Sequence, residues 1–444
     1  MRINLLHLLL LVNGNVFAAT NNDNAASIVH REDPVETLTF DDGPVNIQDP
    51  IQMRAMPIIA DVNSPRHRQE RAHLLRRMAR NHGTWGSTHP RLRLLDTLFG
   101  FTKYKERQII ELNRWRNLYT NVGKKQKKVL ERVVNYKKKL DDVEELIYEN
   151  LMICKSIVSN ALQFYGVTQQ ELDEHIKDAE EKERQADRIS VSQALKHFVR
   201  DWADEGAKER NDAFPCILST LSGLKGVSKE PSPLKVLLPG SGLGRLGHEV
   251  ANLDGFEVTL NEWSMYMNVA YRFIENSTLT NPFSFHPFVD GFSHHATTTD
   301  MLRKVTAPNV TPNSKVLLVE GDFNTAFKDQ AGHYDIIVTH FFIDTARNLM
   351  SYFDTIQLLL KTGGKWLNFG PLLYGTAPFV QLSLDEIIAV VEEMGFAFED
   401  IGDDCGEITF DGKKPRSKEA EYGFNGKALT KNAYAAQVWV VTKK

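Results

Sequence analysis

Cysteine is scarce in this chain of 444 residues, which has only three, at Cys154, Cys216 and Cys405. They lie far apart without a CxxC pair, so we expect neither a disulfide framework nor a zinc cluster, and we predict buried, reduced thiols. No His-x-x-x-His spacing occurs either. The loop histidines His286, His294 and His295 lack a fixed ligand geometry, so we predict no metal site.

An excess of charge of one sign is also absent, because 53 Lys and Arg residues face 57 Asp and Glu residues. The net charge of -4 gives no global electrostatic case for nucleic acid. Hydrophobic content of 42% and charged content of 25% are ordinary for a globular protein. They exclude a collagen, a mostly disordered chain and a polytopic membrane protein, and we expect neither a nucleic-acid nor a membrane partner.

The first 19 residues have the pattern of a secretory signal peptide. Arg2 precedes an apolar run from Ile3 to Val12, and Val16-Phe17-Ala18 resembles a cleavage site. The run is too short for a spanning helix. Residues 20–95 follow without hydrophobic periodicity and are rich in Asn, Asp, Pro and Arg, which predicts an irregular arm.

Within this arm, residues 39–44 read Thr-Phe-Asp-Asp-Gly-Pro and resemble the first metal-site motif of secreted polysaccharide deacetylases. Such an enzyme also needs a His-x-x-x-His pair, which this chain lacks, and the arm is too short for a barrel. A deacetylase-like protein is therefore a minor alternative, since one isolated motif is weak.

Helical periodicity dominates residues 96–205, which predicts an α-helical N-terminal domain. A basic cluster lies on it, formed by Lys124, Lys125, Lys127, Lys128 and residues 137–139, with acidic residues directly behind. We interpret the cluster as a solvated helix face, with a nucleic-acid patch as the alternative. A homodimer through this helical domain stays open.

Short β-rich runs alternate with helical ones in residues 206–444. The runs are 235–238, 257–260, 315–320, 334–339, 365–369, 396–401 and 437–442. Alternating strands and helices predict an α/β domain with a doubly wound, mostly parallel sheet of seven strands. Residues 276–313 form an insertion between its second and third strands.

A glycine-rich turn follows the first of these strands. Gly240, Gly242 and Gly244 let the backbone turn sharply and approach a ligand. A nicotinamide-binding fingerprint requires a third glycine at the position of Arg245. The observed Gly-x-Gly-x-Gly spacing is instead associated with S-adenosylmethionine, which has no pyrophosphate.

Three further strands end in residues suited to this cofactor. Glu262 ends the second strand, where an acid accepts from ribose hydroxyls. After the third strand, Asp322 can accept from the adenine amino group while Phe323 stacks on its ring. His340 ends the fourth strand and should face the methyl donor, because ligands lie beyond the carboxyl ends of the strands.

These segments together resemble the carnosine N-methyltransferase family over about residues 100–444. The matching stretches are 198–202, 237–246, 261–264, 321–323, 341–346 and 370–374. The resemblance implies a Rossmann-like methyltransferase that uses S-adenosylmethionine to methylate an imidazole nitrogen of a histidine-containing dipeptide, carnosine to anserine. It also implies that His197 and Arg200 contact the cofactor, and that Asp344 and Tyr434 contact the dipeptide. Tyr374 should line the same mouth.

Asp344 is the candidate catalytic residue. A carboxylate that accepts from one imidazole N–H leaves the other nitrogen free to attack the methyl group, and it stabilises the positive charge that develops. Helix capping is the structural alternative for Asp344, and a strand aromatic is the alternative for Tyr434.

Two positions depart from the family pattern. His197 replaces a Gln, and Gly375 stands where a substrate-binding His follows the fifth strand. Gly375 keeps a protein histidine or another small amine open as the acceptor, and a non-catalytic scaffold is a third alternative. Because S-adenosylmethionine is made and used inside cells, we expect a cytoplasmic, and also nuclear, location. Residues 1–19 keep secretion as the minority alternative.

Overall fold

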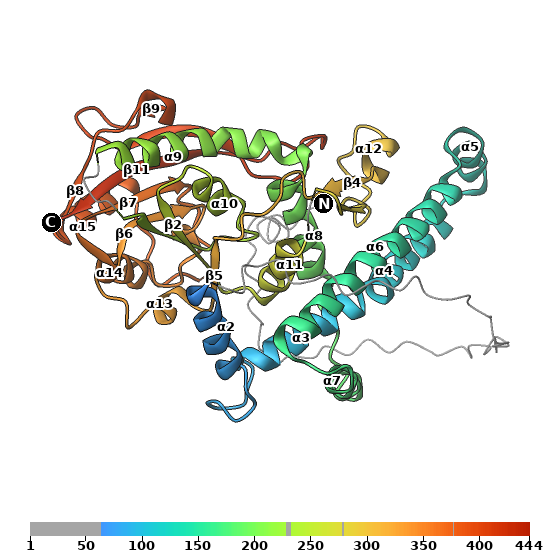
Figure 1. Cartoon of the computed structure of the whole chain (residues 1–444). Helices are drawn as coiled ribbons and strands as arrows, with labels where there is room; N and C mark the ends of the chain where they lie inside the picture. Colours follow the sequence, from blue (N-terminus) through green and yellow to red (C-terminus); the bar gives the residue numbers. More distant parts are fainter. Residues whose placement is uncertain (1–63, 228–231, 278, 376) are drawn as a thin grey trace.

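A computed structural model of the chain describes residues 64–227, 232–277, 279–375 and 377–444 (Figure 1). The signal-like segment 1–19 and the motif at residues 39–44 lie outside them. Within these ranges no helix is long and apolar enough to cross a membrane.

A nine-stranded mixed sheet forms the centre of the described chain. Its strand order is β5 (Leu317–Glu320), β2 (Phe256–Glu262), β1 (Leu234–Pro239), β6 (Tyr334–His340), β7 (Leu360–Gly370), β11 (Ala433–Lys443), β10 (Arg416–Glu421) and β9 (Glu407–Ile408), with β8 (Phe396–Phe398) also paired to β11. The five strands from β5 to β7 are parallel, whereas β11 runs antiparallel to its neighbours. This confirms the predicted α/β class with a mostly parallel sheet.

The sheet has nine strands rather than the seven predicted. The additional strands are β10, which pairs with the first half of β11, and β9, which pairs with β10 at the edge of the sheet. The β10 sequence Arg-Ser-Lys-Glu-Ala-Glu buries only Ala420. It therefore shows no alternation of apolar and polar residues that would mark a strand.

Both faces of the sheet are covered by helices. Val236 and Leu238 of β1 belong to one core cluster, and Leu237 between them belongs to another on the opposite face. The first core includes residues of α9 (Ala207–Val227), α10 (Arg245–Ala251) and α11 (Met265–Glu275). The second includes residues of α13 (Phe323–Ala326), α14 (Leu349–Leu359) and α15 (Leu384–Glu393). This two-sided burial explains the unbroken apolar runs in the middle of β1 and of β6.

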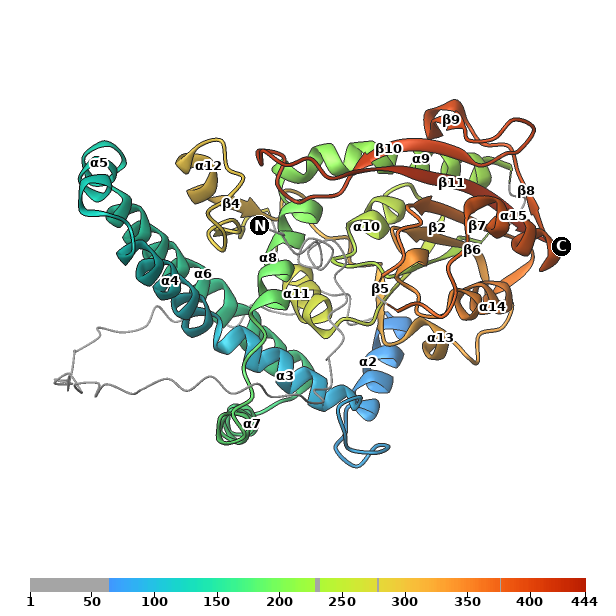
Figure 2. The same ribbon diagram turned by 180° about the vertical axis from the view of Figure 1, so that it is seen from behind.

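The N-terminal half is helical, and its core is continuous with the first core of the sheet. Its helices are α2 (Pro65–Arg77), α3 (Pro90–Thr102), α4 (Tyr104–Thr120), α5 (Lys124–Val134), α6 (Tyr136–Tyr165), α7 (Gln169–Glu181) and α8 (Arg188–Trp202). Helices α4 and α6 form a long antiparallel hairpin that projects from the body of the molecule (Figures 1 and 2). The boundary of a separate helical domain at residue 205 stays a prediction.

Part of the predicted irregular arm is helical, because α2 and the start of α3 lie before residue 96. Helix α2 is held to the sheet by polar contacts. The Arg77 guanidinium donates to the Glu320 carbonyl at 2.8 Å, and the Arg66 guanidinium donates to the Val258 carbonyl at 2.5 Å. Only Leu74 of α2 is buried, so hydrophobic periodicity could not reveal this helix.

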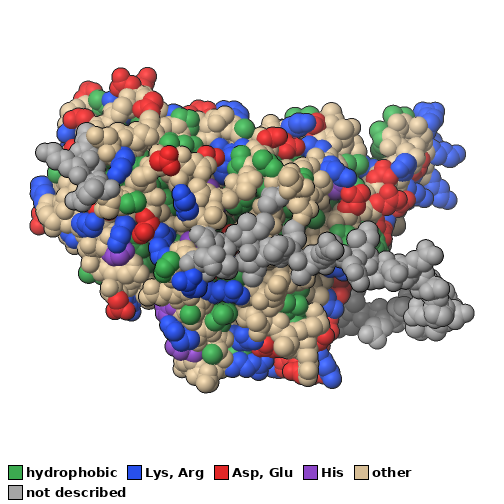
Figure 3. All heavy atoms as spheres, viewed as in Figure 1, with side chains coloured by type: hydrophobic (Ala, Val, Ile, Leu, Met, Phe, Trp, Pro, Cys, Tyr) green, Lys and Arg blue, Asp and Glu red, His purple; other side chains and the backbone are tan. Residues whose placement is uncertain are grey.

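The basic cluster lies at the tip of the hairpin, where α5 buries none of its residues. Lysine and arginine side chains gather there on the surface (Figure 3). Lys138 pairs with Asp142 one turn further along α6. These features fit a solvated helix face.

The predicted insertion contains a small antiparallel sheet of its own. Strand β3 (Phe283–Phe285) pairs with β4 (Val305–Ala307), and α12 (Thr298–Leu302) lies between them. Neither strand belongs to the main sheet.

The prediction of reduced cysteines is wrong for two of the three. Cys216 on α9 and Cys405 in the short 3-10 turn η3 (Asp403–Cys405) form a disulfide, with Cα atoms 4.9 Å apart although the two residues are 189 positions apart in the chain. The packing of α9 near η3 brings them together, and cysteine spacing carries no signal of such a distant pair. Cys154 is a free, buried thiol.

Candidate active site

The glycine turn joins β1 to α10 at the point where β1 lies between β2 and β6. Gly240, Gly242 and Gly244 all have positive φ angles. At Gly244 a Cβ would lie 2.6 Å from both Leu260 and Tyr271, so only glycine allows α10 to pack this closely on β2. The sequence places the turn correctly because its geometry depends on local backbone freedom.

The C-terminal turn of α8 packs directly against this glycine turn. Arg200 Nη2 donates to His197 Nδ1 at 2.9 Å, and Arg200 Nε donates to Asp201 Oδ1 at 2.8 Å. Asp201 Oδ2 in turn accepts from the Leu243 N–H at 3.2 Å. Since arginine can only donate, the proton of neutral His197 is on Nε2. Burial, with the nearby Arg200 charge, lowers the pKa of His197 to about 3.

Glu262 links the end of β2 to the glycine turn. Its Oε2 accepts from the Gly242 N–H at 2.9 Å, and its Oε1 accepts from the Ser264 N–H at 2.7 Å. Burial raises the pKa of Glu262, and these backbone N–H groups oppose that rise. The carboxylate therefore both fixes the turn and presents an acidic group to the adjoining cavity.

Asp322 and Phe323 follow β5 at the same edge of the sheet. Asp322 Oδ1 caps α13 by accepting from the Asn324 N–H at 2.8 Å. The Phe323 ring contacts Phe342 and Tyr352 edge to face, with centroids 5.5 and 5.6 Å away. Phe323 thus belongs to the core and forms part of a cavity wall as well.

His340 ends β6 and has a buried, unpartnered nitrogen. No hydrogen-bond partner of His340 Nε2 exists among the described residues. Burial and the nearby Arg200 charge lower its pKa to about 3, so the ring is neutral. Phe341 follows with φ at +50°, an uncommon conformation for a bulky residue that is often found at functional sites.

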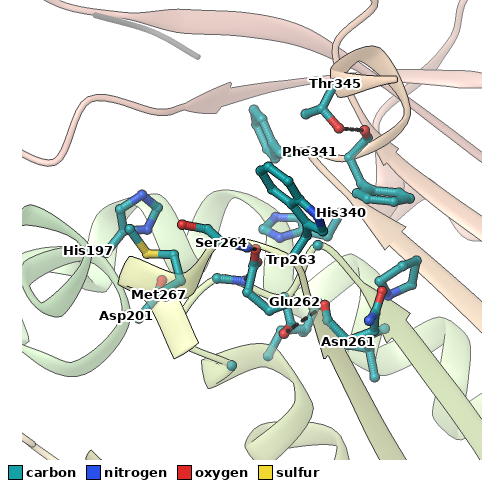
Figure 4. Close-up of a pocket in the computed structure, with 18 of the residues that line it drawn as sticks. His197, Asp201, Asn261, Glu262, Trp263, Ser264, Met267, His340, Phe341 and Thr345 are labelled. Atoms are coloured by element: carbon teal, nitrogen blue, oxygen red, sulfur yellow. Dashed lines mark hydrogen bonds between the residues drawn. The ribbon is translucent and has the colours of Figure 1, made fainter. Parts of the chain in front are cut away.

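A cavity of about 420 Å³ lies beyond the carboxyl ends of these strands. All nine residues predicted to contact the cofactor line it: His197, Arg200, Gly240, Gly242, Gly244, Glu262, Asp322, Phe323 and His340. In Figure 4, His197 and Asp201 reach toward the cavity from α8, and Glu262 lies between them and His340. Residues separated by more than a hundred positions therefore meet in one site.

The three residues predicted to contact the substrate do not line this cavity but lie beside it. Asp344 is 5% exposed in the short 3-10 turn η2 (Ile343–Thr345) after β6. Burial raises its pKa to about 7, although its own N–H and that of Leu373 donate to it. The pKa values of Tyr374 and Tyr434 are raised, mainly by the burial of each ring and also by the nearby Asp344 charge. The three side chains therefore lie within electrostatic reach of one another.

Sequence reasoning missed the loop between β10 and β11, which borders the cavity through Tyr422 and Phe424. The Arg200 guanidinium lies over both rings, 4.7 and 5.4 Å from their centroids. Glu209 holds the loop by accepting from the N–H groups of Gly423 and Phe424. Tyr422 also stacks on Phe341 at 4.7 Å. No sequence motif marks these contacts, because they join segments that are distant in the chain.

A ligand that binds where the strand order reverses, at β1 between β2 and β6, meets the glycine turn and the acid that ends the second strand. With Arg245 at the third position of the nicotinamide fingerprint, the arrangement defines a Rossmann-like methyltransferase that uses S-adenosylmethionine. A family model described as carnosine N-methyltransferase matches residues 177–444, which is more than half of the chain. The chain belongs to the carnosine N-methyltransferase family.

Three relatives with this name illustrate the similarity. The mouse protein is 33% identical over 305 residues, which cover 65% of this chain and 73% of the relative. The Schizosaccharomyces pombe protein is 32% identical over 288 residues, which cover 59% of this chain and 75% of the relative. The rat protein is 34% identical over 277 residues, which cover 59% of this chain and 67% of the relative.

The cavity lining fits the cofactor chemically. Arg200 Nη1 is buried and, like His340 Nε2, has no hydrogen-bond partner in the described part of the chain. Both atoms belong to residues of the cavity wall. A buried cation with an unused donor suits a ligand carboxylate, and S-adenosylmethionine has one.

Proposed function

We propose that this enzyme methylates an imidazole nitrogen of a histidine-containing dipeptide, converting carnosine to anserine. The observation that carries the proposal is the buried Asp344 carboxyl, which lies in the turn after β6 beside the cofactor cavity. Burial raises the pKa of this carboxyl group to about 7. A hydrogen-bond donor that reaches the group favours its ionised form, which is a strong acceptor.

The cofactor contacts follow from the cavity wall. Arg200 would hold the methionine carboxylate, Glu262 the ribose hydroxyls, and Asp322 the adenine amino group. Phe323 would pack on the adenine ring. His197 would help through its bond to Arg200, and His340 through its free nitrogen. When bound, the cofactor supplies a methyl group already activated by a sulfonium centre.

Asp344 would set the reactivity of the acceptor. By accepting from one imidazole N–H, it leaves a lone pair on the other nitrogen and balances the charge that forms on the ring. Tyr374 and Tyr434 would form walls of the acceptor site. The Tyr374 hydroxyl is already fixed, because it donates to the Leu382 carbonyl at 2.8 Å. Alignment of the two reactants then supplies most of the rate, up to about 7–11 kcal/mol in the best cases.

The test is a methylation assay with S-adenosylmethionine and carnosine, in which mass spectrometry detects the product and a synthetic anserine standard identifies it. We expect Asp344→Asn to lower turnover at least about 100-fold. Calorimetry should show unchanged cofactor binding. Normal turnover by this variant would contradict the role of Asp344.

Gly375 supports a second candidate acceptor, a protein histidine. This residue is exposed after β7 and offers no side chain to hold a dipeptide. The same assay with a protein extract, followed by peptide sequencing, would detect methylated protein histidine. Methylation of protein but not of carnosine would establish this alternative.

We also propose a homodimer formed through the helical hairpin. Large apolar side chains are exposed along it and on α5 at its tip, among them Ile110, Leu118, Val129, Val133 and Met152. Light scattering after gel filtration should give a mass of two chains. A monomeric mass at micromolar concentration would contradict the proposal.

A cytoplasmic location is proposed because the cofactor is made inside cells. The disulfide between Cys216 and Cys405 supports the secretory alternative, because structural disulfides are rare in the cytosol. Fractionation of cells that express the C-terminally tagged full chain separates the two. A tagged product in the medium would establish secretion.

A further inference from the structure

Four arginines line the cavity, and three of them are engaged by the protein. Arg200 pairs with Asp201. Arg245 donates to Glu249 at 2.7 Å and to the Asp201 carbonyl at 2.9 Å. Arg210 donates to the carbonyls of Arg200 and Ala203. These three guanidinium groups hold α8, α9 and the glycine turn together.

Arg347 is the fourth, and its guanidinium has neither an ion pair nor a hydrogen bond to any residue that the structure describes. It is exposed at the cavity wall, where it lies over the Phe379 ring at 4.9 Å from the centroid. The Phe379 N–H donates to the Arg347 carbonyl at 2.7 Å. The backbone bond and the ring contact hold this arginine in place and leave its donors available.

The Phe379 side chain is 69% exposed, so burial of its own apolar surface does not explain its position. It belongs to the segment after β7 that also contains Gly375. An aromatic ring that supports a cation at a cavity wall restricts the rotamers of that cation. Less conformational entropy is then lost when the cation binds an anion.

The position of Arg347 relative to Asp344 indicates which anion it meets. The two residues are three positions apart in the turn after β6, so their backbones are separated by at most about 11 Å. In carnosine, histidine is the C-terminal residue, so the carboxylate is attached to the same residue as the imidazole. A substrate whose imidazole reaches Asp344 therefore carries its carboxylate into the neighbourhood of Arg347.

We propose that Arg347 binds the free carboxylate of the dipeptide and so makes the enzyme select small peptide acids over histidine within a protein chain. The proposal rests on the proposed function and deepens it. Arg347 would also supply a cationic group to an acceptor site in which Gly375 contributes no side chain. An internal histidine of a protein has no such carboxylate and would leave Arg347 unpaired.

The experiment compares carnosine with β-alanylhistamine, which is the same molecule without the carboxylate. We expect the wild type to prefer carnosine, and Arg347→Ala to raise the KM for carnosine about tenfold with little change in kcat. The KM for β-alanylhistamine should not change. Arg347→Lys should recover part of the preference, because it keeps the charge but loses the planar fork.

Lys328→Ala is the matched control, because it removes an exposed cation that lies outside the cavity. It should leave both KM values unchanged. An equal rise for both substrates in Arg347→Ala, or no rise for either, would overturn the inference while leaving the proposed function intact. If the wild type methylates neither compound, the proposed function fails, and the inference fails with it.

Discussion

The ring of Phe342 lies so close to Gly240 that a Cβ added to Gly240 would sit 2.2 Å from Phe342 Cδ2. The φ angle of Gly240 is +63°, which also disfavours any other residue. The first glycine of the turn is therefore required for two independent reasons, one steric and one conformational.

We predict that Gly240→Ala lowers the affinity for S-adenosylmethionine at least about 30-fold, because the turn must move away from Phe342. Calorimetric titration measures the affinity, and circular dichroism checks the fold. Gly363→Ala is the control, because Gly363 has a φ of +79° and no atom within 4 Å of its Cβ position. The control should cost only about 1 kcal/mol of stability. Equal losses of affinity in both variants would contradict the steric argument.

The second prediction concerns Arg200 and the carboxylate of the cofactor. Arg200→Met should weaken S-adenosylmethionine binding about 10- to 100-fold, because a buried, charge-assisted hydrogen bond is lost. Decarboxylated S-adenosylmethionine supplies the matched ligand. Its affinity should be low for the wild type and nearly unchanged by the substitution. If Arg200→Met weakened both ligands equally, Arg200 would have only a structural role.

The third prediction concerns the pH dependence that Asp344 gives to stability. Its pKa is about 7 in the folded chain, against 3.8 as the ordinary value. Between these values the folded state binds more protons than the unfolded state, so the free energy of unfolding falls as pH rises. Asp344→Asn removes this dependence. From pH 4 to pH 8, the wild type should lose up to about 4 kcal/mol relative to the variant.

Urea unfolding of both proteins at several pH values measures this difference. The same stability gap between wild type and Asp344→Asn at pH 4 and pH 8 would show that the carboxyl group does not titrate in this range.

The fourth prediction concerns a buried ionic network between the helical layer and β5. Arg272 Nε donates to Glu320 at 2.9 Å, Arg272 Nη1 donates to Glu275 at 2.8 Å, and the Tyr165 hydroxyl donates to Glu320 at 3.0 Å. Arg272→Met removes the cation that pairs with the buried Glu320 and the partly buried Glu275. It should therefore destabilise the protein by about 3–5 kcal/mol.

The control for this change is Arg114→Met, which breaks an exposed pair with Glu111. Such an exposed pair is screened by water and contributes little to stability. Chemical denaturation of both variants gives the comparison, and a similar small loss in each would mean that the buried network does not stabilise the fold.

The sequence predicts the central strands well, because short continuous apolar runs such as Val236-Leu237-Leu238 are typical of strands buried on both faces of a sheet. It also brings the right residues to the cavity, since the ends of parallel strands meet at one edge. Residues held by long-range polar contacts escape this reasoning. Helix α2 carries no apolar stripe, and Tyr422 reaches Arg200 only through the folding of a distant hairpin. The roles of Asp344 and Tyr434 stay predictions.

Helix α8 adds a constraint on how this enzyme could be divided or recombined. A fragment that starts at residue 206 would retain the described strands of the main sheet and the whole glycine turn. It would lack His197, Arg200 and Asp201, and with them the Asp201 carboxylate that fixes the Leu243 N–H. The proposed cofactor site is therefore not a transferable module of the Rossmann-like half. Any exchange of the helical layer between relatives would also exchange part of the cavity wall.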